Sequence, residues 1–540
     1  MTDSMNNRAK LVAIGLLALS IGPLFFLLDS RREPTSASET KSINPKNPDN
    51  AKMFSQLITG TLNQSEEKRL NKTCRTHPLR NIFCPSILRK GSILAYIRLR
   101  KKVPSFSEPK TISPVMPRFG REGIANWNEL RRGDIAELLP GLSALNSNQL
   151  KVLASLAQDE RRCPNHIAIA VAATQEGHVG GSLFYSDIAP LYVVGGRCFP
   201  AGSDDQENFY TRAALFFYLS KKHQESLTLL KRIKPSDAFN GRTHYWIYRN
   251  LIELGKENEA ERALQTLLDR HPLAFHTALA ASSKHPGFVA SMMASKRVSR
   301  PAHFRSPRVN NLKDQIETLF QYGFNESAAI LTGWAFDEYE YLSSRTKLYL
   351  SEFADATTRV KHLPMALHSQ PNLISRHSLG LAFPKEYLAL MTKYGNGNDP
   401  YLLLSIARKE SLFDPHVISP ANAVGLIQVS LGTSRLYTQG MMPNLSDPVV
   451  NITIGAKYLS DLLLKMGGNL AFAVASYNAG EHHIPDWRAR FPTNDPVLFI
   501  DLIPYRETRN YVASVLNSYF WYLHLNNRDT SLMLRQLGVQ

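Results

Sequence analysis

Residues 401–415 read YLLLSIARKESLFDP, and this stretch decides how the last third of the chain folds. Leu403 and Glu410 recur at helical spacing on one face, which predicts a helix over residues 401–413. Pro415 disfavours helical backbone at the residue before it and therefore ends this helix. We expect Glu410 to be an acid on the apolar face of a helix, close to the carboxyl end of that helix.

Two features of this position are expected to raise the pKa of Glu410. Apolar surroundings disfavour the charged form of a carboxyl group, and the dipole at a helix carboxyl end opposes negative charge. A carboxylic acid that stays protonated near neutral pH can act as a general acid. The alternative is a structural glutamate paired with Lys or Arg, and the downstream sequence decides between the two.

Further short motifs follow in residues 416–511. A loop begins at Ser419-Pro420, an alanine-rich helix is predicted over residues 470–476, and Gly480 is placed for a left-handed C-cap. A final helix begins near Pro504 and carries two polar residues one turn apart. The motifs in chain order are Glu410-Ser411, Ser419-Pro420, Gly425-Leu426-Ile427-Gln428, Asn451-Ile452-Thr453-Ile454-Gly455, Tyr477-Asn478-Ala479-Gly480 and Glu507-Thr508-Arg509-Asn510-Tyr511.

This series resembles the catalytic domain of soluble lytic transglycosylases, the goose-type lysozyme-like proteins of glycoside hydrolase family 23. The resemblance implies a lysozyme-like, mainly α domain with Glu410 as its single catalytic acid and base. It implies no cofactor and no metal. The residues that it assigns to holding or positioning sugar are Ser411, Gln428, Tyr477, Asn478, Glu507 and Tyr511. The sequence departs from the family pattern at Asn422, Ile427, Ser430 and Leu431.

The resemblance implies non-hydrolytic cleavage of the MurNAc-β-1,4-GlcNAc bond of peptidoglycan, with 1,6-anhydroMurNAc ends as products. Most glycosidases use two carboxylates, and no second acid stands near Glu410 in a partner motif. Asp414 is expected to be a cap or surface residue. Two alternatives remain: a hydrolytic muramidase with the same domain, and a non-catalytic scaffold that binds peptidoglycan.

Upstream, residues 126–286 show one helical pattern after another and almost no β-type alternation. Ser226 and Leu230 are matched by Ala260 and Leu264 at a period of 34 residues, which favours an α-solenoid of helix pairs. Trp246 and Tyr248 are expected in its core. The chain is predicted to be all-α, with a tether and unassigned region at 29–117, a superhelical domain at 118–375 and a lysozyme-like domain at 376–540.

The N-terminus carries an apolar run over residues 11–28, preceded by Arg8 and Lys10. Its length suits either an uncleaved membrane anchor or a signal segment, here taken as residues 1–28. Both interpretations place the rest of the chain outside the cytoplasm, in the periplasm. The inner membrane is then an expected partner, and no protein partner is indicated.

The formal net charge of +17 attracts polyanions, which include nucleic acid, anionic lipid and cell wall. The sequence has no zinc-finger spacing or arginine-rich block, so nucleic acid is not expected. The His482-His483 pair is predicted to lie in a surface loop rather than to bind a metal. The even number of cysteines suits an oxidising compartment, with disulfides between neighbours as the simplest pairing and reduced thiols as the alternative: Cys74, Cys84, Cys163 and Cys198.

Overall fold

The structure is a computed structural model, and it describes most of the chain from residue 116 onward. The described residues are 116–120, 123–133, 135–159, 166–175, 185–233, 241–285, 287–295, 304, 306–339, 342–439 and 443–538. The chain divides into two compact units. The smaller unit includes residues 298–363, and the larger unit joins residues 110–297 to residues 364–540.

Regular structure in the described residues is helical, apart from a hairpin of strands β1 (Phe119–Gly120) and β2 (Gly123–Ile124). The predicted all-α class is therefore confirmed. No described helix combines the length and the apolar character needed to span a bilayer. The predicted segment 1–28, the tether up to residue 115 and three of the four cysteines, Cys74, Cys84 and Cys163, lie outside the described residues.

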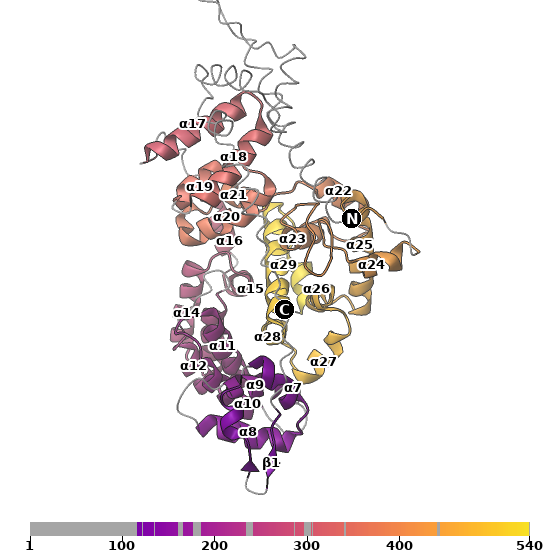
Figure 1. Ribbon diagram of the computed structural model, residues 1–540. Coiled ribbons are helices and arrows are strands. Elements are labelled where there is room, and N and C mark those ends of the chain that lie inside the picture. The colour runs from indigo at the N-terminus through magenta and orange to yellow at the C-terminus, as the bar shows by residue number, and fades with distance from the viewer. Residues whose placement is uncertain are drawn as a thin grey trace, which may run out of the picture. The chain divides into compact units, whose positions relative to one another are not determined.

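The N-terminal half of the larger unit is built from successive helices. They are α6 (Trp127–Leu130), α7 (Ile135–Ser143), α8 (Ser147–Asp159), α9 (His166–Gln175), α10 (Tyr185–Gly196), α11 (Asp204–Leu219), α12 (His223–Leu230), α13 (Arg242–Glu253), α14 (Glu257–Arg270), α15 (Phe275–Lys284) and α16 (Gly287–Ala294) (Figure 1). The helices from α7 to α14 pack largely against their neighbours in sequence, as in a solenoid.

The predicted repeat of 34 residues corresponds to two helix pairs, α11–α12 and α13–α14. Ser226 and Leu230 are buried on α12, and Ala260 and Leu264 are buried at the matching places on α14. The turn between α13 and α14 passes through Gly255 at φ +69°. Trp246 and Tyr248 are buried, as predicted for the core of this region.

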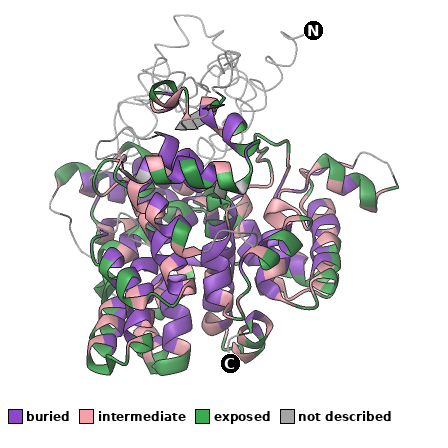
Figure 2. Ribbon diagram, turned by 90° about the horizontal axis from the view of Figure 1, so that it is seen from below, coloured by how far each residue is buried: buried purple, intermediate pink, exposed green. Residues whose placement is uncertain are grey.

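The C-terminal half of the larger unit contains the region of the motifs. Its helices are α21 (Arg376–Ala382), α22 (Leu388–Tyr394), α23 (Pro400–Glu410), α24 (Leu431–Tyr437), α25 (Pro448–Lys465), α26 (Leu470–Ala479), α27 (His483–Arg490), α28 (Pro496–Leu502), α29 (Arg506–Leu525) and α30 (Ser531–Leu537). The long helix α29 lies against both α23 and α26 (Figure 1). Burial on most of its faces explains its high content of aromatic residues. Helices of the described residues carry buried segments beside exposed ones (Figure 2).

The smaller unit has its own apolar core. The unit contains helices α17 (Pro307–Gln321), α18 (Asn325–Glu338), α19 (Ser344–Leu350) and the start of α20 (Ala356–Ser369). Its buried cluster includes Leu312, Ile316, Ala328, Phe336 and Leu350. A separate core of this kind is what allows these helices to form a compact unit.

Three local predictions differ from the structure. Helix α23 ends at Glu410 rather than at residue 413, because the Phe413 N–H donates to the Ser411 hydroxyl at 3.1 Å and both Leu412 and Phe413 have positive φ. Gly480 has positive φ, but its ψ of 141° lies outside the left-handed helical region. His483 begins helix α27 rather than lying in a loop.

The buried repeat position on α14 gives a test of the solenoid core. Leu264→Ala should lower the free energy of unfolding by about 2–5 kcal/mol, because it removes buried methyl groups and leaves a cavity. Ile252→Ala on α13 is the control, since Ile252 is 44% exposed and should change stability by less than about 0.5 kcal/mol. Urea unfolding followed by circular dichroism measures both. Equal losses would contradict the assignment of Leu264 to the core.

Candidate active site

Glu410 is the last residue of α23, and the helix face that leads to it is buried. Leu403 and Ala407 on this face are fully excluded from solvent. Burial is the main cause that raises the pKa of Glu410 to about 7. The Tyr511 hydrogen bond and the Lys409 charge oppose this shift, and the Glu507 charge adds to it. The expected acid on an apolar helix face is therefore present, and its surroundings favour the protonated form more than water does.

Tyr511 contacts this carboxyl group directly. Its hydroxyl donates to Glu410 Oε1 at 2.7 Å, and its side chain is buried on α29. Burial and the nearby Glu410 charge raise the pKa of Tyr511 well above its ordinary value. Tyr511 is therefore a permanent hydrogen-bond donor that stabilises the ionised form of Glu410.

Tyr477, near the end of α26, is the second tyrosine of the site. Burial, followed by the Glu410 charge, raises the pKa of Tyr477 well above its ordinary value, which places its hydroxyl within electrostatic reach of that carboxyl group. The hydroxyl donates to the carbonyl of Ile427 at 2.8 Å. The ring packs on Tyr458 of α25 at 5.3 Å between centroids. These contacts fix the phenol beside Glu410.

Hydrogen bonds connect the loop over residues 417–430 to the end of α23. The buried Ser411 hydroxyl donates to the carbonyl of Leu426 at 2.7 Å. The Gln428 side-chain amide donates to the carbonyls of Val417 at 3.0 Å and Gly425 at 2.8 Å. Ser411 and Gln428 were both predicted to bind substrate. In the structure, the Ser411 hydroxyl and the Gln428 amide nitrogen bind backbone carbonyls of this loop.

Asn451 on α25 begins one of the sequence motifs, but it was not among the residues predicted to form the site. It is fully buried, accepts from the Ile427 N–H at 2.9 Å and donates to the carbonyls of Val424 at 2.7 Å and Leu445 at 2.9 Å. The sequence does contain an indication of this role, because Asn451 is an amide among apolar residues of a predicted helix. A buried amide needs hydrogen-bond partners for its polar atoms.

The departures from the family pattern are accommodated in the loop. Asn422 adopts φ +60°, the left-handed backbone that Asn tolerates, so the turn is preserved without glycine. Ser430 caps α24 by accepting from the Thr433 N–H at 3.0 Å. Leu431 begins that helix with 38% of its surface exposed.

The remaining predicted residues lie at the junction of α26 and α29. The Thr508 hydroxyl donates to Asn478 Oδ1 at 2.6 Å, which ties the two helices together. Glu507 is exposed on the first turn of α29, and its charge acts on Glu410. The structure therefore brings Glu410, Tyr477, Glu507 and Tyr511 into one electrostatic group. Cys198 lies after α10, outside this site, and its predicted disulfide remains a prediction.

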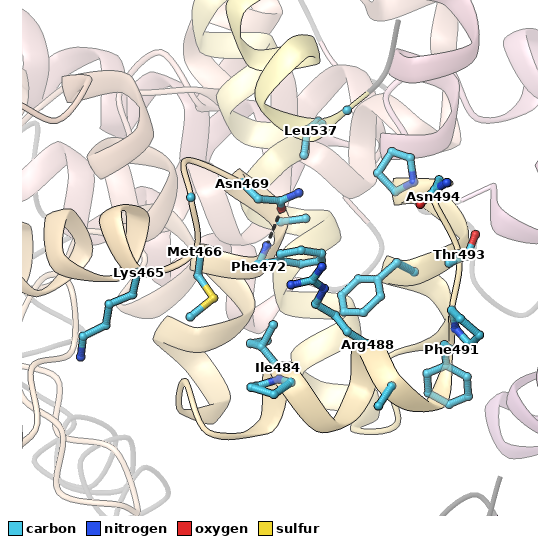
Figure 3. A pocket seen from close by; sticks show the side chains of 18 residues that line it. Lys465, Met466, Asn469, Phe472, Ile484, Arg488, Phe491, Thr493, Asn494 and Leu537 are labelled. Carbon is cyan, nitrogen blue, oxygen red and sulfur yellow. Dashed lines mark hydrogen bonds between the residues drawn. The ribbon is translucent and has the colours of Figure 1, made fainter. Parts of the chain in front are cut away.

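A separate cavity of about 1040 Å³ lies among α26, α27, α28 and α30 (Figure 3). The Arg488 guanidinium sits over the Phe472 ring there, at 5.1 Å from its centroid. None of the predicted site residues lines this cavity, and no carboxylate does. Within the described residues, no cluster of His, Cys, Asp and Glu is arranged to hold a metal ion.

The contact at Gly455 gives a test of this geometry. A Cβ at Gly455 would lie 2.3 Å from Ile427 Cδ1 and 3.0 Å from the Tyr477 hydroxyl, so Gly455→Ala should displace both. Gly380→Ala on α21 is the control, because its Cβ would meet nothing within 4 Å. We expect a loss of stability of about 1–3 kcal/mol in the first variant only. Similar unfolding midpoints for the two variants would contradict the tight contact.

The sequence is similar to known proteins over the part of the chain that contains this site. Residues 388–499 match the family model described as the transglycosylase SLT domain. The chain is 27% identical over 317 residues to a soluble lytic murein transglycosylase of Salmonella typhimurium, covering 57% of this chain and 47% of that protein. It is 30% identical over 183 residues to membrane-bound lytic murein transglycosylase F of Shewanella pealeana, covering 29% of this chain and 38% of the relative.

Among solved structures, the 70 kDa soluble lytic transglycosylase of Escherichia coli matches with 20% identity and a TM-score of 0.47. That match covers 89% of this chain and 81% of the other. The chain spans about half the length of the first curated relative. Glu410, Ser411, Gln428, Tyr477 and Asn478 lie inside the span that the family model matches. Residues 388–499 are thus the part of the chain that is similar to the transglycosylase SLT domain.

Proposed function

We propose that this chain is a lytic murein transglycosylase that cleaves the MurNAc-β-1,4-GlcNAc bond of peptidoglycan without water. The observation that carries the proposal is the Glu410 carboxyl group, with its pKa raised to about 7 and its hydrogen bond from Tyr511, within an SLT domain. A carboxyl group of this kind is available in both protonation states near neutral pH, which suits a residue that must give and then take a proton.

In the first step, protonated Glu410 donates its proton to the glycosidic oxygen as the bond to the MurNAc C1 breaks. Positive charge develops on the sugar ring as the leaving GlcNAc departs. Glu410 becomes ionised in the same step, and the Tyr511 hydroxyl at 2.7 Å stabilises the new negative charge. The bond from Tyr511 is thus of most use after proton transfer.

In the second step, the ionised Glu410 takes the proton from the MurNAc 6-hydroxyl, and that oxygen bonds to C1. The ring closes as a 1,6-anhydro sugar, and Glu410 returns to its protonated form. Glu507 is the carboxylate whose charge reaches Glu410, but it is exposed on α29 and therefore suits sugar positioning better than covalent catalysis. The substrate N-acetyl group would then stabilise C1 in place of a protein nucleophile.

We propose the periplasm as the site of action, in cell-wall remodelling or turnover. The relatives include proteins named as soluble and as membrane-bound lytic murein transglycosylases. The apolar run at residues 11–28 and the net charge of +17 support export and attraction to an anionic wall. Anchoring to the inner membrane and the disulfides remain part of this proposal.

The first prediction of the proposal concerns Glu410 itself. Glu410→Gln should lower the rate of release of anhydro-ended fragments from purified sacculi by at least about 10³-fold, since one residue supplies both the acid and the base. The variant should stay folded. Above pH 7 it should be more stable than the wild type, because the fold no longer contains a carboxylate that burial disfavours.

Mass spectrometry of the digest measures this rate and identifies the products. Glu261→Gln on α14, with a side chain 65% exposed, is the control and should release fragments at the wild-type rate. Undiminished release by Glu410→Gln would overturn the assignment of Glu410. Reducing MurNAc ends in the wild-type digest would instead indicate a hydrolytic muramidase.

The pH dependence of the rate gives a second test. The protonated form of Glu410 starts the reaction, so activity should be present below a pH of about 7 and be lost as the pH rises through that value. Tyr511 favours the ionised form, so Tyr511→Phe should raise the pKa of Glu410 and move the alkaline limb upward by roughly one pH unit.

Tyr519→Phe on the same helix is the matched control. Its hydroxyl donates to Asp399 Oδ2 at 3.1 Å rather than to Glu410. The alkaline limb should stay in place in that variant. An unmoved limb in Tyr511→Phe, or an equal shift in Tyr519→Phe, would contradict the role given to the Tyr511 hydrogen bond.

A further inference from the structure

Asp501, near the end of α28, is a buried carboxylate outside the group around Glu410. Its side chain accepts from Arg242 Nε at 2.8 Å and from Trp246 Nε1 at 2.7 Å, and it bonds His276 Nε2 at 2.7 Å. All four residues are largely or fully excluded from solvent. The partners come from α13 and α15, in the N-terminal half of the larger unit, whereas Asp501 belongs to the half that carries Glu410.

The charge on Asp501 is retained inside the protein. Burial alone would raise the pKa of this carboxyl group, but His276 and the Arg242 guanidinium outweigh burial and hold the pKa well below its ordinary range. A buried, ionised carboxylate with three directional partners has little freedom to move. It therefore defines the place where the end of α28 meets α13 and α15.

The same set of contacts continues into the first turns of α29. Arg242 also donates through Nη2 to Asn510 Oδ1 at 3.2 Å. Arg509 donates to the carbonyl of Ile503 at 2.8 Å and to Asn208 Oδ1 of α11 at 2.5 Å. Arg506 donates to Asp205, also on α11, at 2.9 Å. Residues 506, 509 and 510 thus fasten one side of this helix end to the solenoid helices.

The other side of the same turns carries the groups of the proposed reaction. Glu507 and Tyr511 lie one turn apart there, and Thr508 donates to Asn478. A helix turn moves as one body, because its backbone hydrogen bonds link all its residues. A shift of the fastened side therefore shifts the Tyr511 hydroxyl relative to Glu410.

We propose that Asp501 is a positioning residue for the transglycosylase reaction, which sets the Tyr511–Glu410 hydrogen bond by locking the start of α29 to α13 and α15. This inference rests on the proposed function for its kinetic consequences. It assigns the solenoid helices a part in the chemistry, since three side chains from them determine where a hydrogen-bond donor of the site lies. Displacements of about 1 Å in such donors are enough to slow catalysis strongly.

Asp501→Asn in the full chain tests this directly. The amide keeps the shape of the side chain but removes the negative charge that holds Arg242 and His276. We expect kcat on soluble glycan strands to fall roughly tenfold to a hundredfold with KM within about twofold of wild type. The alkaline limb should also move upward, in the same direction as in Tyr511→Phe.

The control is Asp495→Asn, which weakens a second ion pair between the same helices. Asp495 caps the other end of α28 and bonds Arg249 of α13 at 2.7 Å. It should cost stability but leave kcat and the alkaline limb unchanged. Rates are compared at a temperature at which wild type and variants are fully folded by circular dichroism. Equal effects of the two substitutions, or an unmoved limb in Asp501→Asn, would overturn the inference.

A second variant and an NMR titration test the same role of Asp501. If Asp501→Asn does not fold, the exposed Asn510→Ala removes the link from Arg242 to the residue before Tyr511, and it should lower kcat and move the limb in the same direction. Carboxyl carbon NMR of glutamate-labelled protein, assigned with Glu410→Gln, reads the pKa of Glu410 without turnover. That pKa should rise in Asp501→Asn and not in Asp495→Asn, whatever the product analysis of the wild type says about the proposed function.

Discussion

Partial burial of one carboxyl group is the constraint on which the rest of this site depends. Glu410 ends α23 with apolar residues beneath it, and burial keeps its pKa near 7 instead of near 4.5. Burial without a hydrogen-bond donor would make the ionised state less accessible at neutral pH. The buried Tyr511 hydroxyl corrects this, because it offers one strong hydrogen bond to the carboxylate. The balance of the two effects places both protonation states within reach.

Several buried polar contacts hold the loop and the second tyrosine that lie beside Glu410. Ser411, Gln428 and Asn451 fasten the loop at residues 417–430, which in turn accepts the hydrogen bond from Tyr477. These contacts explain why polar side chains of the motifs lie beneath the surface. Some motif residues therefore act on the charge of Glu410, and others hold the backbone of the loop at residues 417–430.

The sequence was sufficient for most of the helices and for the place of Glu410 at the end of one of them. Periodicity placed Glu410 at a helix end, and the spacing of Glu507 and Tyr511 placed them on one turn of α29. It was insufficient where long-range contacts decide the local conformation. The end of α23 at Glu410 depends on Ser411 bonding the Phe413 N–H and the Leu426 carbonyl, which no local propensity reveals. The partners of Asp501 are likewise more than two hundred residues away in sequence.

The Asp501 contacts have a consequence for how this protein can be divided. Cutting the chain before the lysozyme-like half would leave a carboxylate near the end of α28 without the three side chains that now surround it, and apolar faces of α28 and α29 would meet water. Such a fragment would lack part of its own interior. The two halves of the larger unit therefore depend on each other structurally, and the half that carries Glu410 is not expected to fold as an independent module.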